Sequence, residues 1–265
     1  MNTNNILKAA NILFQNKLNG SRIRSLPPNC TPQNSTEAYK IQNELKILCL
    51  SLKENISIGK KVGCTNKVAQ EQIKIYEPFY GELYSKFSSK NDCTLNSNNF
   101  YKPHAEPEIS FRLKEDVNVT KAPFTIHNVD ELFDGLLASI EIVDFRFNKE
   151  LKDIGINNLI SSNGASEHWV YGEDIHPINK INLENHVVNI YADTLLIDEG
   201  NTNNVLENPL NSALWVINHL ALKGEPLLKG QFISTGTCTK AIQIKPGNTI
   251  KADFGVIGCI KLNYV

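Results

Sequence analysis

Residues 136–147, LLASIEIVDFRF, limit the fold of this chain most strongly, because they are apolar almost throughout and still carry two carboxylates. An apolar run of this kind predicts a strand that is buried on both faces. Glu141 and Asp144 would then lie in the interior, where a charge needs a counter-ion, a metal ion or a shifted pKa. Arg146 is one available counter-ion. The fold must therefore bring further charged groups to this strand.

A second pair of carboxylates stands in residues 105–113, AEPEISFRL, which predict another strand. Side chains alternate between the two faces of a strand, so Glu106 and Glu108 point the same way. They could be solvated on an edge strand, where Pro107 would block pairing. Grouped with Glu141, they would instead form a set of three carboxylates without a His or Cys cluster. Such a set favours Mg²⁺ or Mn²⁺ over zinc.

Two glycine-containing segments are candidates for the surroundings of this site. Lys61 has Gly59 and Gly63 on its own strand face, which we expect to leave room for a ligand beside it, although a solvated lysine is the common case. In residues 234–237, Ser-Thr-Gly-Thr, Gly236 allows backbone N–H groups and hydroxyls to approach a substrate oxygen. A plain turn would have the same composition.

The order of the expected elements indicates the fold class. Helices are predicted at 5–17, from the Asn34 cap to Leu52, from the Asn128 cap to Leu136, and from Pro209, with Asn208 as its cap, to Gly224. A polar loop is expected at 88–99, and strands and turns fill the chain from Gly230 onward. Helices followed by strands predict an α+β fold rather than an alternating Rossmann arrangement. We expect an N-terminal α/β portion, 1–90, and a strand-rich core, 91–265, in one continuous unit.

The charge balance and the cysteines exclude several classes of protein. The 265 residues include 27 basic and 28 acidic ones, a formal charge of −1, so binding of nucleic acid or of a membrane through a basic surface is not expected. The six cysteines form no CxxC pair, and neither a signal peptide nor a membrane-spanning apolar run is visible. These features predict a cytoplasmic protein with reduced thiols.

Taken together and in order, these segments resemble the fumarylacetoacetate hydrolase superfamily. Within it they are most similar to the branch of 2-keto-4-pentenoate hydratases and 4-oxalocrotonate decarboxylases. The residues that carry the resemblance are Ala38-Tyr-x-Ile-Gln42, Gly59-Lys-Lys-Val-Gly63, Glu106-Pro-Glu-Ile-x-Phe111, Glu141-Ile-Val-Asp-x-Arg146, Asn163-x-x-Ser166, Asn208-Pro-Leu-x-x-Ala-Leu-Trp215, Gly230, Ser234-Thr-Gly-Thr237 and Pro246-Gly-x-x-Ile-x-Ala-Asp-Phe-Gly-x-x-Gly258.

The resemblance implies a strand-rich mixed β core with N-terminal helices and a smaller α/β portion. It implies one Mg²⁺ or Mn²⁺ ion held by Glu106, Glu108 and Glu141, with Asp144 as an undecided member, and Lys61 as the catalytic lysine. The metal would chelate the 1-carboxylate and 2-oxo oxygens of a short α-keto acid. The expected substrate-binding residues are Gly63, Cys64, Asn163, Ser166, Thr235, Gly236 and Thr237.

At one position the chain departs from the pattern that the resemblance implies. Hydratases of the branch carry Pro-Asp-Phe-Gly after the lysine strand, and the acid works with the lysine on the water or the proton. Here residues 78–81 are Pro-Phe-Tyr-Gly, with Phe79 in place of the acid. Glu77 shares the face of Phe79, and strand parity places Glu82 on the opposite face.

The expected activity is a metal-dependent lyase reaction on a 2-hydroxy-2,4-dienoate or 2-oxo-4-enoate. The first expectation is hydration of 2-hydroxypenta-2,4-dienoate, and the second is decarboxylation of a 4-oxalocrotonate-type substrate. Hydrolysis of an acylpyruvate and a non-catalytic partner subunit remain open. A homo-oligomer is expected, and a complex with a related hydratase or decarboxylase is a further option.

Overall fold

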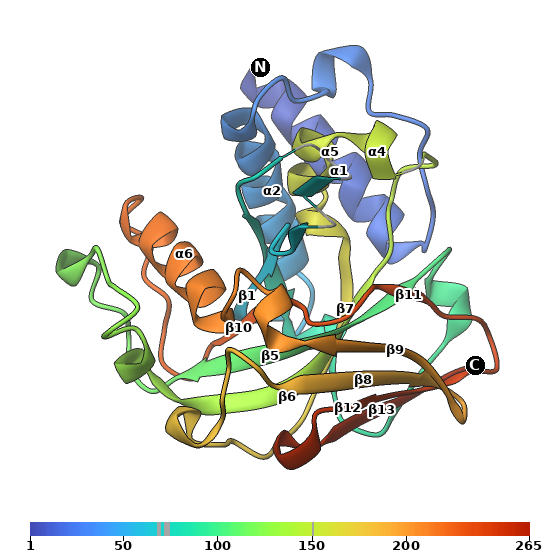
Figure 1. Ribbon diagram of the computed structural model, residues 1–265. Helices are drawn as coiled ribbons and strands as arrows, with labels where there is room; N and C mark the ends of the chain where they lie inside the picture. Colours follow the sequence, from blue (N-terminus) through green and yellow to red (C-terminus); the bar gives the residue numbers. More distant parts are fainter. Residues whose placement is uncertain (68–69, 72–74, 150) are drawn as a thin grey trace.

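The computed structural model describes residues 1–67, 70–71, 75–149 and 151–265, and the strands of this part form two sheets (Figure 1). The larger sheet has eight strands, in the order β2-β1-β10-β5-β6-β7-β3 with β11 paired to β5, and the smaller one has five, in the order β4-β13-β12-β8-β9. The strands are β1 Ser57–Gly63, β2 Phe79–Tyr84, β3 Ser88–Lys90, β4 Cys93–Leu95, β5 His104–Leu113, β6 Phe133–Val143, β7 Ser166–Tyr171, β8 Val187–Ala192, β9 Leu195–Asn201, β10 Phe232–Thr237, β11 Ile242–Gln243, β12 Thr249–Asp253 and β13 Cys259–Tyr264.

Helices cover two places on this framework. In Figure 1, α1 (Thr3–Leu18), α2 (Ser35–Leu50), α4 (Leu151–Ile154) and α5 (Ile156–Ser161) gather on one side of the strands, and α6 (Pro209–Ala221) lies apart from them near β10 and β1. Two of the three predicted caps are confirmed, because Asn34 Oδ1 accepts the N–H of Glu37 at 3.0 Å and Asn208 Oδ1 accepts the N–H of Leu210 at 2.9 Å. The third is wrong, because Asn128 Oδ1 accepts the N–H of Thr125, which precedes it, and caps no helix. No helix in the described part is long and apolar enough to cross a membrane.

Strands β5 and β6 form the centre of the larger sheet and position the site. Every residue of β6 except Asp134 is buried, which confirms the prediction of a strand buried on both faces. The strand begins at Phe133 and ends at Val143 rather than spanning 136–147, so Asp144 and Arg146 lie beyond its end. The two strands run antiparallel, with Glu106 opposite Glu141 and Glu108 opposite Ser139. Strand β10 lies on the other side of β5, and β1 pairs with β10 in parallel. Four strands far apart in the sequence therefore meet at the carboxylates.

Two local predictions are wrong, for the same physical reason. The expected loop 88–99 contains β3 and β4, which pair with β7 and β13. The expected helix from Asn128 to Leu136 is a single turn, Asp130–Leu132, because the chain from Phe133 onward pairs with β5. In both places backbone pairing with a distant strand overrides the local pattern.

The expected fold class is confirmed. Helices α1 and α2 precede all the strands, α4 and α5 lie between β6 and β7, and α6 lies between β9 and β10. Both sheets contribute to one large buried apolar cluster. Strands β1, β2 and β3, from the first 90 residues, lie in the same sheet as β5, β6, β7 and β10.

Candidate metal centre

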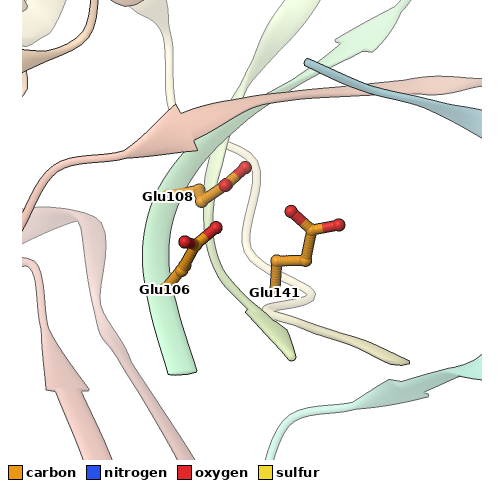
Figure 2. Close-up of side chains that lie close together, drawn as sticks. All are labelled: Glu106, Glu108 and Glu141. Carbon is orange, nitrogen blue, oxygen red and sulfur yellow. The ribbon is translucent and has the colours of Figure 1, made fainter. Parts of the chain in front are cut away.

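Three carboxylates converge at the middle of the larger sheet. Glu106 and Glu108 extend from one face of β5, and Glu141 extends from β6 directly opposite Glu106. Figure 2 shows the three side chains directed toward a shared space. One oxygen atom of each carboxylate lies within 4.8 Å of the other two. The strand register, which joins segments about thirty residues apart, therefore produces a compact set of oxygen donors.

The surroundings of these carboxylates fit a bound divalent cation. Glu108 and Glu141 are fully buried, and Glu106 is half-buried. Among the described residues, the Oε1 atoms of Glu108 and Glu141 have no hydrogen-bond partner. A buried carboxylate oxygen without a partner is costly, and a cation that prefers oxygen ligands removes this cost. The donors are all carboxylates, so they suit Mg²⁺ or Mn²⁺ better than zinc.

Strand β10 holds the second oxygen of Glu108. Ser234 Oγ donates to Glu108 Oε2 at 2.5 Å, and the Gly236 N–H donates to the same atom at 3.0 Å. Trp169 Nε1 in turn donates to Ser234 Oγ at 3.2 Å. Ser234 was not among the predicted site residues, although strand alternation places it on the face of Gly236 and could have identified it. These bonds fix Glu108 so that its free Oε1 remains available to a ligand.

Lys61 of β1 is the cation beside the carboxylates. Its Nζ lies 3.1 Å from Glu141 Oε2 and donates to the Gly164 carbonyl at 3.1 Å. Burial disfavours the charged amine, but Glu141 and the other two carboxylates outweigh burial and raise the pKa of Lys61 above its usual value. Lys61 is therefore a charged ammonium group held in a fixed orientation at the edge of the candidate metal centre.

The space expected beside Lys61 is filled, so that prediction is wrong. A Cβ at Gly59 would lie 2.0 Å from the Phe232 carbonyl oxygen of the neighbouring strand, and a Cβ at Gly63 would lie 2.5 Å from Cζ of Phe79. Both glycines thus permit close packing rather than ligand entry. The reason is that each faces a cross-strand neighbour, which the spacing along one strand does not reveal.

Phe79 packs its ring against Gly63 on one side and Gly164 on the other. A Cβ at Gly164 would lie 2.7 Å from Phe79 Cε2, and Lys61 Nζ lies 5.5 Å from the centre of the ring. Where the resemblance implies an aspartate, this chain therefore has an apolar ring next to Lys61. Glu82 lies on the other face of the sheet, as predicted, where it pairs with the buried Lys60.

Gly63→Ala should reduce the free energy of unfolding by about 1–3 kcal/mol, the usual cost of overpacking a core. The added methyl group would overlap the Phe79 ring. Denaturant unfolding measures the effect, and Gly63→Ala with Phe79→Leu should restore most of the lost stability. Gly172→Ala is the control, because its Cβ would come no closer than 3.3 Å to the end of the Ile260 side chain. Unchanged stability of Gly63→Ala would contradict this packing.

The turn at residues 163–165 presents the carbonyl that holds Lys61. Asn163, Gly164 and Ala165 all have left-handed backbone angles, with φ of 62°, 63° and 61°. Such angles are costly for residues other than glycine and often accompany functional sites. The Asn163 side chain accepts from the Glu82 N–H at 2.7 Å and donates to the Glu82 carbonyl at 2.9 Å. Its amide therefore anchors the turn to β2, and the Ser166 carbonyl accepts from Lys17 at 3.0 Å.

The other predicted substrate-binding residues have different local partners. The Thr235 hydroxyl donates to the Ile109 carbonyl at 2.8 Å, and the Thr237 hydroxyl donates to the Thr239 carbonyl at 3.0 Å. Gly236 is required by close approach, because a Cβ there would lie 1.8 Å from Thr65 Oγ1. The Gly236 N–H donates to Glu108, one of the three carboxylates Glu106, Glu108 and Glu141, which we call the trio. Thr237 lines the adjoining cavity.

Cys64 and Asp144 lie outside the trio. The Cys64 thiol donates to the Ile75 carbonyl, and burial raises its pKa to about 11, so it stays a neutral thiol. Asp144 is fully buried and accepts the N–H groups of Tyr101 at 2.5 Å and Lys102 at 3.1 Å. Its counter-ion is Arg22, at 3.6 Å, and not Arg146, the sequence-based candidate, which pairs with Glu167.

An open cavity of about 1990 Å³ leads from the surface to the carboxylates. Glu106, Thr237 and His104 line it, whereas Lys61, Glu108 and Glu141 are buried and do not line it. Arg22 and Lys102 line the same cavity. A small molecule can thus reach Glu106 from solvent.

The stability gained from Mg²⁺ should increase with pH. Burial, followed by the neighbouring Glu141, raises the pKa of Glu106 from 4.5 to about 7. Between these values the metal-free folded protein binds more protons than the unfolded chain, so its stability falls as the pH rises. Mg²⁺ binds the deprotonated carboxylates and offsets this loss. The Mg²⁺-induced increase in Tm should be larger at about pH 8 than at about pH 5.5. An equal increase in Tm at both pH values would contradict this prediction. Glu106→Gln should weaken the pH dependence of the Mg²⁺-induced increase.

No protein-family model matches the chain. A 2-keto-4-pentenoate hydratase of Burkholderia vietnamiensis is 25% identical over 264 residues, which covers 98% of both chains. A 4-oxalocrotonate decarboxylase of Pseudomonas putida is also 25% identical and covers 100% of this chain and 98% of its own.

Solved structures show the same relationship at the level of the fold. The 4-oxalocrotonate decarboxylase of Pseudomonas putida G7, solved with magnesium and adipate, superposes with a TM-score of 0.92 at 22% identity over 100% of this chain and 99% of its own. A yeast fumarylacetoacetate hydrolase family protein has a TM-score of 0.55 at 16% identity, over 77% of this chain and 91% of its own. The resemblance noted in the sequence is therefore confirmed: the chain has the fumarylacetoacetate hydrolase fold and is similar over its whole length to 2-keto-4-pentenoate hydratases and 4-oxalocrotonate decarboxylases.

Proposed function

We propose that this protein is a divalent-metal-dependent lyase that hydrates a short 2-hydroxy-2,4-dienoate, such as 2-hydroxypenta-2,4-dienoate. The observation that carries the proposal is the trio Glu106, Glu108 and Glu141, of which Glu108 and Glu141 are fully buried, with Lys61 3.1 Å from Glu141. Full-length similarity to hydratases supports the same reaction class. The trio together with Lys61 also argues against a non-catalytic partner subunit, since unpaired buried carboxylates are costly without a ligand.

The roles of the residues follow from their positions. Glu106, Glu108 and Glu141 would hold Mg²⁺ or Mn²⁺, and the bound ion would stabilise negative charge on the 2-oxygen of the substrate. Lys61, charged and directed by the Gly164 carbonyl, can donate a proton to the carbon chain or hold a carboxylate. Lys61, Glu108 and Glu141 are buried, which strengthens their electrostatic interactions.

A second candidate reaction is decarboxylation of a 4-oxalocrotonate-type substrate, and Phe79 favours it. An apolar ring beside Lys61 cannot activate a water molecule, whereas loss of CO₂ needs only stabilisation of the electrons left on the substrate and one proton. The decarboxylase that matches the whole chain supports this reading. Hydrolysis of an acylpyruvate ranks lower.

One assay separates the two reactions. The protein with Mg²⁺ is incubated with 2-hydroxypenta-2,4-dienoate and, separately, with 4-oxalocrotonate. Formation of 4-hydroxy-2-oxopentanoate supports hydration, and release of CO₂ supports decarboxylation. Removal of Mg²⁺ by a chelator should stop either reaction. Activity on neither substrate would refute both proposals.

We further propose a cytoplasmic homo-oligomer. All six cysteines are unpaired in the structure, which suits a reducing compartment. Most soluble oligomers are symmetric assemblies of one chain. Sedimentation of the purified protein tests the oligomeric state, and co-purification tests a complex with a related hydratase or decarboxylase.

A further inference from the structure

Lys61 takes its orientation from the turn at residues 163–165, so the contacts that fix this turn also act on the lysine. The Gly164 carbonyl accepts from Lys61 Nζ at 3.1 Å. Left-handed backbone angles are unfavourable for Asn163 and Ala165, and such angles persist only where surrounding contacts enforce them. The conformation of the turn therefore depends on its bonds to other parts of the chain.

The buried ammonium group of Lys17 is bonded to the two residues that follow the turn. Lys17 stands in the last turn of α1, and its Nζ donates to the Ser166 carbonyl at 3.0 Å and to Glu167 Oε2 at 2.8 Å. The same Nζ lies 4.2 Å from the centre of the Phe87 ring. One ammonium group thus holds a backbone oxygen and a carboxylate of consecutive residues, which fixes the start of β7 relative to α1.

Arg146 completes a buried cluster of charges around Glu167. Arg146 Nε donates to Glu167 Oε1 at 2.8 Å, and Arg146 Nη2 lies 2.6 Å from Glu167 Oε2. Lys17, Arg146 and Glu167, which we call the ion triad, are 8%, 3% and 6% exposed. Burial disfavours the charged carboxylate, but Lys17 and Arg146 outweigh burial and lower the pKa of Glu167. Binding of a carboxylate by two N–H groups of one guanidinium is directional, so Glu167 is held in one orientation.

The chain that follows β6 is bonded to both ends of this arrangement. The Asp144 N–H donates to the Ala165 carbonyl at 3.0 Å, within the turn, and Arg146 binds Glu167 just after it. At the other end of the turn, the Asn163 side chain is bonded to the backbone of β2. The ion triad therefore joins α1, the chain after β6 and the start of β7 at the point where the turn ends.

We propose that Lys17, together with Glu167 and Arg146, positions Lys61 for catalysis, because the ion triad keeps the turn at 163–165 in the conformation that directs the Gly164 carbonyl at the lysine. Lys17 is a positioning residue, since it does not line the cavity that leads to the carboxylates. This inference rests on the proposed function, because it takes Lys61 to act on the substrate. The alternative is that the ion triad only stabilises the fold.

Amide hydrogen exchange examines the turn without any substrate. The N–H groups of Asp144 and Glu82 are bonded to the turn and report its opening. In Lys17→Met both should exchange about 10-fold faster, the equivalent of one charge-assisted hydrogen bond. The Cys238 N–H, which donates to a carbonyl of β5, should exchange at an unchanged rate. An equal acceleration of all three amides would indicate a general loss of stability and would overturn the proposal.

Steady-state kinetics, with whichever of the two proposed substrates is turned over, measures the effect on Lys61. Lys17→Met should lower kcat about 10- to 100-fold, because misplacing a reacting group by about 1 Å can cost that much. The KM and the Mg²⁺ affinity should stay unchanged, since the trio is intact. In the Lys61→Met background the same substitution should have no further effect on kcat, because the group that Lys17 positions is absent.

Leu13→Ala is the matched control, because it removes a buried side chain of the same helix and should lower the Tm without changing kcat. An unchanged kcat in folded Lys17→Met, an equal loss of kcat in Leu13→Ala, or a full additional loss in the Lys61→Met background would each overturn the role of Lys17. Faster exchange at Asp144 and Glu82 in a protein that turns over neither substrate would refute the proposed function and confirm that the ion triad holds the turn. Unchanged exchange at both amides would overturn this inference whatever the activity.

A second variant keeps the test valid if Lys17→Met does not fold. Glu167→Asp preserves the charge balance and shortens the side chain by one methylene group, so its carboxylate cannot bind Lys17 and Arg146 as Glu167 does. We expect faster exchange of the Asp144 N–H and a several-fold lower kcat, with unchanged Mg²⁺ affinity. Unchanged exchange and kcat in Glu167→Asp would overturn the role of the ion triad.

Discussion

Glu108→Gln is expected to weaken Mg²⁺ binding by more than about 100-fold and to remove enzymatic activity, because loss of residues that merely orient metal ligands already costs 10- to 100-fold. Burial, followed by Glu141 and Glu106, raises the pKa of Glu108 well above its usual value. In the metal-free protein the Glu108 carboxyl therefore favours its neutral form, which a glutamine side chain resembles. The glutamine oxygen can still accept from Ser234 and Gly236. The variant should keep its fold and its metal-free Tm, and calorimetry should report the lost affinity.

The matched control is Glu184→Gln, an exposed acid that lines the same cavity outside the trio. It should bind Mg²⁺ as the unmodified protein does. Unchanged Mg²⁺ affinity in Glu108→Gln would place the metal elsewhere and refute the candidate centre. A large fall in the metal-free Tm would show that Glu108 has mainly a structural role.

Lys61→Met should lower kcat by about 10²- to 10⁴-fold, the usual contribution of a general acid or base. Its positive charge lies 3.1 Å from Glu141, so its removal also takes repulsion away from a bound cation. Mg²⁺ should therefore bind Lys61→Met at least as tightly as it binds the unmodified protein. Loss of turnover with retained metal affinity is the signature of a group that acts on the substrate, and steady-state kinetics with metal titration measures both.

Lys60→Met provides the comparison, because Lys60 is the next residue on β1 and pairs with Glu82 on the opposite face. Breaking this buried pair should cost stability, by roughly 3–5 kcal/mol, and should affect chemistry only through that loss. A similar kcat in Lys61→Met and the unmodified protein would remove Lys61 from the mechanism. Equal losses in the two variants would point to a general effect on the sheet.

The sequence by itself determined the features that depend on neighbouring residues. The caps Asn34 and Asn208 and the helices that follow them were predictable, because a cap is a contact between residues two or three positions apart. The common face of Glu106 and Glu108 follows from the period of a strand. The carboxylates within residues 136–147 require counter-ions or a metal ion supplied from elsewhere in the chain, and the resemblance to the family identifies the candidate metal ligands.

Only the tertiary structure decided which distant groups meet. The register of β5 and β6 places Glu141 opposite Glu106. The packing of β1 against β2 fills the space at Gly63 with the Phe79 ring. Asp144, which follows β6 in the chain, forms an ion pair with Arg22. Backbone pairing likewise turned the polar segment 88–99 into strands β3 and β4. These contacts join segments from about 15 to more than 100 residues apart. Strand pairing is selected by the whole packed sheet, so no local pattern of residues specifies it.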